Sequence, residues 1–220
     1  MSTTTSYRLC GIALLVGSAL SVVYYLIQGA FLTGNDPATM ASPLSVGSSV
    51  IGFIGSVFVL LGLPGVYARQ ARRAGVLGLL GVLGIWYVTL MQGVIIPFTS
   101  VTFVPMLAAH PTTQFLLMTQ PPNWRPFFLV SFLCQVLAIL FLGIATLRAR
   151  VFPRWIGWLL IVTLVAGILS FAPFLPDAVS NLAPILGSVA MAGFGYELLK
   201  PTPVEETQLA PTSVEAGVRS

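Results

Sequence analysis

Long apolar runs, each about as long as a lipid bilayer is thick, constrain this chain more than any other feature. We place six of them at about 9–32, 46–68, 76–97, 127–147, 155–175 and 182–199. An α-helix of about 20 apolar residues crosses the hydrocarbon core, and in lipid each backbone polar group must find its partner within its own segment. The sequence therefore predicts an all-α fold, a polytopic membrane helix bundle with six transmembrane helices over residues 8–200.

Charged side chains are scarce, as expected for a chain whose solvent is the bilayer. They make up 7% of the residues, against about a quarter in soluble domains, and a charge is expensive in hydrocarbon. The net charge of +4 is carried in short loops between the apolar runs and not along one face. This placement argues against a nucleic-acid partner and favours the lipid bilayer.

The basic residues alternate from loop to loop. With a cytoplasmic N-terminus, the only basic residue on the outside is Arg125. The inside segments hold Arg8, Arg69, Arg72, Arg73, Arg148, Arg150, Arg154, Lys200 and Arg219. Because positively charged loops stay in the cytoplasm, we expect both termini there. For the cluster from Arg69 to Arg73, a site for an anionic ligand or lipid headgroup is the alternative role.

Three segments lie outside the expected spans. Residues 1–7 and 201–220 are polar and poor in large apolar side chains, which predicts disordered tails. Residues 98–126 form a long extracytoplasmic loop, and loops of this length are often functional. Its apolar pieces predict short helices that lie in the headgroup region or cap the bundle, and Trp124 fits an aromatic belt at the interface.

Small residues recur at helical spacing within the first three runs. Ala13, Gly17 and Ser21 repeat at i+4, as do Ser48, Gly52 and Ser56, whereas Gly75, Gly78, Gly81 and Gly84 repeat every third residue. Small side chains let helix backbones approach closely in lipid. We therefore expect these residues to pack helices together in one bundle.

Polar side chains in the outer half of the spans are the candidates for a ligand site. By depth, three glutamines and two tyrosines gather there: Gln28, Gln92, Gln135, Tyr24 and Tyr25. His110 and Trp124 of the long loop complete the candidate set. A cavity open to the outside is one hypothesis, and plain hydrogen bonds between helices are the other. Glu197, the only acidic residue within a span, lies near the cytoplasmic end and is expected to pair with Lys200.

Catalytic and cofactor signatures are absent from the sequence. It has no phosphate-binding loop, nucleophile elbow, zinc-protease or dinucleotide motif. His110 with Asp36 or Asp177 would be the only candidate metal or acid–base site, and nothing in their spacing requires one. We expect no cofactor, and of three functions we favour a small-molecule binder or transporter over a structural or regulatory membrane partner, with an enzyme third.

One segment carries a resemblance. LLGLPGVYARQARRAGVLGLLGVLG, which covers the second and third runs, resembles uncharacterised bacterial multi-span membrane proteins. In these a Leu-Gly-Leu-Pro-Gly-(Leu or Val)-Tyr-Ala descent precedes arginines and a glycine-rich helix. The resemblance implies a protein of the bacterial cytoplasmic (inner) membrane and no known activity, so it assigns no site residue. A strong preference for arginine, with Lys200 as the only lysine, also suggests a bacterial genome rich in GC.

Overall fold

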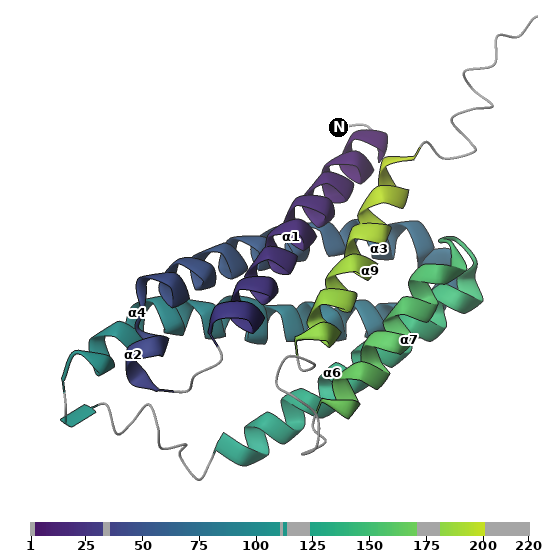
Figure 1. Cartoon of the computed structure of the whole chain (residues 1–220). Helices are drawn as coiled ribbons and strands as arrows, with labels where there is room; N and C mark the ends of the chain where they lie inside the picture. The colour runs from purple at the N-terminus through teal and green to yellow at the C-terminus, as the bar shows by residue number, and fades with distance from the viewer. Residues whose placement is uncertain (1–2, 33–35, 111, 114–123, 171–180, 201–220) are drawn as a thin grey trace, which may run out of the picture.

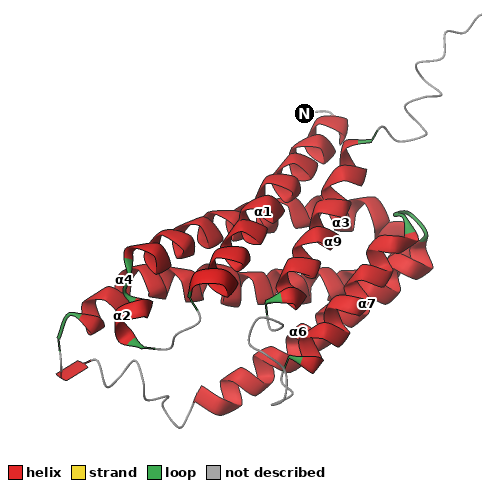
Figure 2. Ribbon diagram, viewed as in Figure 1, coloured by secondary structure: helices red, strands yellow, loops and turns green. Residues whose placement is uncertain are grey.

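The computed structural model describes residues 3–32, 36–110, 112–113, 124–170 and 181–200. Within these ranges the regular structure is entirely helical (Figures 1 and 2). The helices are α1 (Thr3–Phe31), α2 (Pro37–Met40), α3 (Pro43–Val88), the π-helix η1 (Thr89–Ile95), α4 (Ile96–Ala108), α6 (Trp124–Ala149), α7 (Arg154–Leu169) and α9 (Leu182–Leu199). The predicted all-helical fold is confirmed for the part of the chain described here.

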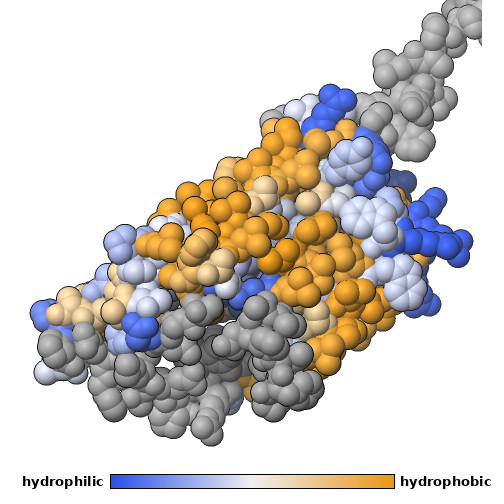
Figure 3. All heavy atoms as spheres, in the orientation of Figure 1, coloured by the Kyte–Doolittle hydropathy of each residue, from blue (hydrophilic) through white to orange (hydrophobic). Residues whose placement is uncertain are grey.

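Among the described residues, four helical stretches are long and apolar enough to cross a membrane. They are Thr4–Phe31, Pro43–Ala108, Leu129–Ala149 and Leu182–Leu199, and α7 is a shorter apolar helix. Large apolar side chains are also exposed on every long helix, for example Leu61 at 61%, Val76 at 72% and Trp158 at 59%. Figure 3 shows this surface as a broad orange band. Soluble proteins rarely expose so much contiguous apolar surface, which suggests a membrane protein.

α3 turns back on itself at Gly75. The backbone there has φ 57° and ψ −148°, a conformation open almost only to glycine. The arm before it (residues 43–74) and the arm after it (residues 76–88, continued by η1 and α4) run antiparallel, because Gly93 of η1 contacts Ser56. We expected Gly75 to pack helices, but nothing lies within 4 Å of the position its Cβ would take. Its role is to make the turn.

The long helices form a closed ring. α1 packs against α3 and α9, α3 against α6, α6 against α7, and α7 against α9 (Figure 1). Counting the two arms of α3 separately, each neighbouring pair is antiparallel. Glycines mark the crossings in the predicted manner: Gly17 meets Gly55, Gly81 meets Leu142, and Gly84 meets Ala138. The packing role predicted for Gly17, Gly52, Gly81 and Gly84 is confirmed.

One end of the ring, which we call the basic end, is filled. It holds the turn at Gly75, the connection from α6 to α7 and the C-terminus of α9, and its core consists of Leu14, Leu63, Val66, Val82, Leu142, Phe152, Ile156, Phe194 and Leu198. The rings of Phe152 and Phe194 meet edge to face at 4.9 Å. In Figure 3 the strongest blue lies at this end.

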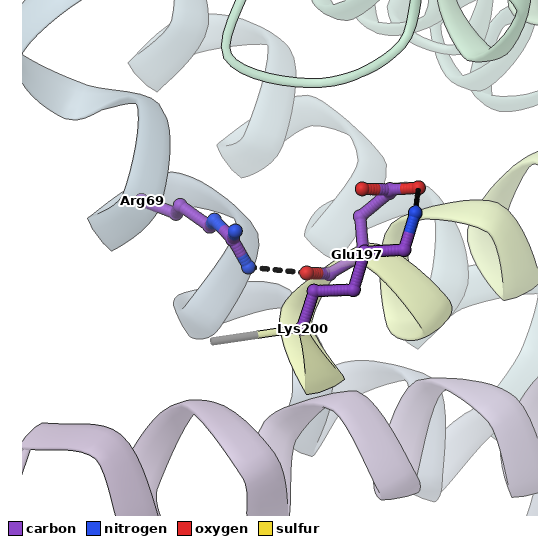
Figure 4. Close-up of polar contacts among 3 residues, drawn as sticks. All are labelled: Arg69, Glu197 and Lys200. Carbon is purple, nitrogen blue, oxygen red and sulfur yellow. Dashed lines mark hydrogen bonds and ion pairs between the residues drawn. The ribbon is translucent and has the colours of Figure 1, made fainter. Parts of the chain in front are cut away.

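A polar cluster ties the basic end together (Figure 4). The Arg69 guanidinium donates to the backbone carbonyl of Glu197 and lies 5.8 Å from the centre of the Phe152 ring. The Glu197 carboxylate accepts from Lys200 Nζ at 2.6 Å, so the predicted pairing of these two residues is confirmed. The guanidinium of Arg69 is charged at any physiological pH.

Two boundaries differ from expectation. α1 begins at Thr3, within the tail expected at residues 1–7, since no glycine or proline interrupts the chain before Cys10. The helix after η1 continues to Ala108, although we expected a loop from residue 98. Pro97 does not end the helix, because it stands in the first turn of α4, directly after the π-helix, where its missing N–H is tolerated.

The polar residues after Pro97 also adapt to the helix. The hydroxyls of Thr99 and Ser100 donate to the Ile96 carbonyl, and that of Thr102 donates to the Phe98 carbonyl. Their hydrogen-bonding capacity is therefore met without leaving the helix. Most of the remainder of the expected 98–126 loop, and the tail at 201–220, lie outside the described residues.

Candidate ligand-binding cavity

A cavity of about 500 Å³ lies in the half of the ring away from the basic end. Its walls come from α1, both arms of α3, η1, α4, α6, α7 and α9, so every segment of the ring contributes to it. Cavities of this size are typical of small-molecule sites, including those between the helices of bundles. It is the principal candidate site in the described part of the chain.

The floor of the cavity is apolar. Five ring segments each supply one side chain to it: Val59, Ile85, Ile139, Leu160 and Met191. All five belong to the buried core that continues toward the basic end. The cavity is therefore closed on that side by packed hydrocarbon.

A polar tier lies about one helical turn above the floor. On the same five segments it consists of Ser56, Thr89, Gln135, Thr163 and Ser188, to which α1 adds Ser21 and η1 adds Gln92. A step of three or four residues returns a helix to the same face. Each segment thus presents an apolar residue and then a polar one to the same space.

Gln92 and Gln135 face each other across the cavity wall. The Nε2 of Gln92 donates to Oε1 of Gln135 at 3.0 Å. One carboxamide bond leaves Oε1 of Gln92 and Nε2 of Gln135 for further partners. Rotation of both carboxamides by 180° would make Gln135 the donor and Gln92 the acceptor. In either arrangement the pair leaves one oxygen and one nitrogen without a partner in the other residue. It can therefore meet a group that both donates and accepts.

The π-helix η1 carries Gln92 to this position. Its wider turn precedes Pro97, whose ring crowds the carbonyl four residues earlier in an α-helix. At Gly93 a Cβ would overlap Oγ of Ser56, so only glycine lets η1 lie this close to the first arm of α3. Single π turns inside helices are frequent at functional sites.

Two tyrosines of α1 complete the wall. The ring of Tyr24 packs on Gly52, and the rings of Tyr24 and Tyr25 meet at 4.9 Å. Gln28 forms a side-chain hydrogen bond with Tyr24, one turn beyond the lining. Of the seven side chains we singled out from the sequence, the structure brings four to the cavity: Tyr24, Tyr25, Gln92 and Gln135.

The loop candidates do not join this group. His110 is exposed, at the end of α4. Asp36 Oδ2 accepts from the Thr39 amide at 2.9 Å and caps α2. Hydrogen bonds with the side chain of Thr39 and then with its amide lower the pKa of the Asp36 carboxyl. The side chain of Trp124 and all of Asp177 lie outside what the structure describes. Among described residues, no three His, Cys, Asp or Glu side chains gather as a metal would require.

Sequence reasoning missed the hydroxyls of the polar tier. Ser21, Thr163 and Ser188 donate to carbonyls of their own helices, at Gly17, Leu159 and Pro184. Serine and threonine occur throughout these helices, so their presence alone marks nothing. A usable signal is the three- or four-residue step from a large apolar residue to a hydroxyl or amide, repeated on several segments.

Charge is absent from the described lining of the cavity. The lining includes no Asp, Glu, Lys, Arg or His, whereas Arg69, Glu197 and Lys200 lie together at the basic end. A second buried amide, Gln70, lies near that end at 0% exposure, and neither of its side-chain polar atoms has a hydrogen-bond partner. The cavity is thus a neutral site in a bundle whose charges lie elsewhere.

Comparison with known proteins adds no assignment, since no protein-family model, curated protein or solved structure matches the chain. The function must therefore be argued from the cavity and its surroundings.

Proposed function

We propose that this chain spans the cytoplasmic membrane of a bacterium six times, with both termini in the cytoplasm, and that it binds or transports a small molecule through the cavity. The observation that carries the proposal is the cavity itself, about 500 Å³ inside the ring. A bundle with a purely structural role would be expected to pack its helices against one another here, because close side-chain packing is what holds helices together in lipid.

The six-span topology draws support from the antiparallel ring. Counting both arms of α3, six segments alternate in direction. The turn at Gly75 and the connection between α6 and α7 lie at the basic end with Lys200. Because arginine-rich ends stay in the cytoplasm, the cavity faces the outer side. The arginine preference and the resemblance of the second and third runs support a bacterial membrane.

Reporter fusions test this topology. A reporter active only in the cytoplasm should work when fused after Lys200 or inserted after Arg150, and should fail when inserted after Ala109 or Ser170. Reporter activity after Ser170 would show that α7 does not cross the membrane. At 16 residues, α7 is the shortest of the six segments.

Cysteine accessibility tests the cavity. Val136 lines it, whereas the next residue, Leu137, is 46% exposed on the outer surface of the bundle. We would introduce Val136→Cys or Leu137→Cys into a chain in which Cys10 and Cys134 are alanine, and would treat each protein in lipid nanodiscs with a charged methanethiosulfonate. The cysteine thiolate attacks the thiol-side sulfur of this reagent and displaces methanesulfinate, and the thiolate forms in water and not in hydrocarbon.

We expect rapid modification of Val136→Cys and little modification of Leu137→Cys, although the two positions share one helix and one depth. The small-molecule proposal would be wrong if neither cysteine reacted, since the cavity would then be dry and closed. In that case a membrane partner without a ligand would be the better account. Reaction at Leu137→Cys alone would show that α6 is rotated away from the arrangement described here.

A further inference from the structure

We infer that the ligand is an uncharged amphiphile, whose apolar end rests on the floor and whose hydrogen-bonding group, able both to donate and to accept, meets the oxygen and the nitrogen that the bonded pair of Gln92 and Gln135 leaves free. The inference rests on the proposed function, since it names the class of molecule that the same cavity takes. It follows from three features: the lack of charge, the order of the two tiers and the groups that the polar tier leaves free.

The absence of charge in the lining selects against ions. A charged group in a site walled by protein and lipid loses hydration that only an opposite charge or a full set of hydrogen bonds can replace. At the basic end, Lys200 pairs with the Glu197 carboxylate and Arg69 donates to the Glu197 backbone carbonyl, whereas the Asp36 carboxylate caps α2. An anionic or cationic ligand would thus find no counter-charge among the described residues of the lining.

The order of the tiers gives the ligand a direction. On each of five segments the residue nearer the basic end is apolar and the residue one turn away is polar, as with Ile139 and Gln135 or Met191 and Ser188. A uniformly polar solute such as a sugar would leave its hydroxyls against hydrocarbon at the floor. A molecule with one apolar end can instead bury that end there.

The hydrogen bonds already made limit what five residues of the polar tier can offer a ligand. Ser21, Thr163 and Ser188 use their protons within their own helices, so their oxygens can only accept from a ligand. The amide pair leaves one oxygen and one N–H₂ group. A hydroxyl or an amide on the ligand can accept from that nitrogen and donate to that oxygen, whereas an ether or a ketone can only accept.

Protection of Val136→Cys from the thiol reagent provides the test, using the full chain in lipid nanodiscs. The probes share one skeleton: 4-butylphenol, butylbenzene, the anion 4-butylbenzoate and the cation 4-butylbenzylammonium, with glucose as a solute lacking an apolar end. Rates are measured with both a cationic and an anionic reagent, so that the charge of a probe does not bias the comparison. Probe concentrations are corrected for partition into the bilayer.

We expect 4-butylphenol to slow modification saturably, about tenfold at ten times its half-maximal concentration. Butylbenzene should need about thirtyfold more, because it lacks both hydrogen bonds to the amide pair, each worth about 1 kcal/mol. The two ions and glucose should protect less than either. Equal or better protection by an ion or by glucose, or no protection by 4-butylphenol, would overturn the inference.

Substitution of the amide pair supplies the matched control. Gln135→Leu should raise the half-maximal concentration of 4-butylphenol about fivefold and leave that of butylbenzene unchanged. Gln70→Leu removes a buried amide outside the lining and should change neither value. The probe comparison on the unsubstituted amides does not depend on how these variants fold. If Val136→Cys is inert even without a probe, the proposed function fails; if it reacts but the probes rank differently, only the ligand class fails.

Discussion

The crossing of α3 and α6 at Gly81 provides the sharpest test of how the ring is packed. A Cβ at Gly81 would lie 2.5 Å from the backbone nitrogen of Leu142 and 2.8 Å from its Cα. Ordinary Cβ contacts begin near 3.4 Å, so the two helices would have to separate by about 0.9 Å (3.4 − 2.5) at this point. The obstacle is backbone and cannot rotate aside, and such overpacking costs about 1–3 kcal/mol.

Gly47→Ala is the matched control for Gly81→Ala. Both glycines belong to α3, but nothing lies within 4 Å of a Cβ at Gly47. Each substitution gains up to about 1 kcal/mol from the higher helix propensity of alanine. The free energy of unfolding of Gly81→Ala should therefore fall below that of Gly47→Ala by about the packing cost alone, 1–3 kcal/mol.

Equilibrium unfolding in mixed detergent and dodecyl sulfate micelles, followed by the fluorescence of the four tryptophans, would measure this difference. Equal stabilities, within about 0.5 kcal/mol, would mean that α3 and α6 do not meet backbone to backbone at this point. The ring as described would then be wrong between these two helices.

Three further predictions concern single residues. Gly75→Ala should lower the free energy of unfolding in the same assay by about 1–3 kcal/mol, because φ 57° with ψ −148° is strained for alanine; an unchanged value would place the turn elsewhere. Gln70→Met should raise the free energy of unfolding by about 1–3 kcal/mol, since the substitution removes two buried polar atoms without partners. A loss of stability would show that the amide has a partner, such as a buried water. The Asp36 carboxyl should titrate below 3.8 by NMR, because its hydrogen bond with Thr39 favours the charged form. The stability that the charged Asp36 gives to the α2 cap is present above the pKa of the unfolded chain and is lost as the pH falls through the lower pKa of the folded chain. A measured pKa at or above 3.8 would contradict the cap.

Much of the fold could be predicted from the lengths of the apolar runs, because the bilayer sets the length of a spanning helix. The pairing of Glu197 with Lys200 followed from their spacing on one helix. The sequence did not predict that the helix continues past Pro97 to Ala108, because no residue pattern marks the π-helix that precedes this proline. The assignment of Gly75 to packing failed for a similar reason: spacing does not reveal a positive φ.

The cavity could be predicted only in part. The glutamines stood out because an amide is costly in hydrocarbon, and their depth placed them together. The hydroxyls of the polar tier could not be recognised in the sequence. A helix that faces lipid on one side and protein on the other is apolar on both sides, so its inward face has no distinct composition. Periodicity therefore gives little indication of which face of such a helix points inward. Packing decides it, as at Gly93 against Ser56.

The most direct test of the account is the side of the membrane from which the cavity can be reached. Val136→Cys, in the chain without native cysteines, would be treated with an impermeant charged thiol reagent in right-side-out and in inside-out membrane vesicles. The packed core at the basic end and the arginines around it predict modification from the outer face only, with Leu137→Cys inert from both. Modification of Val136→Cys from the cytoplasmic face alone, or from neither face, would contradict a cavity that opens outward above a closed basic end.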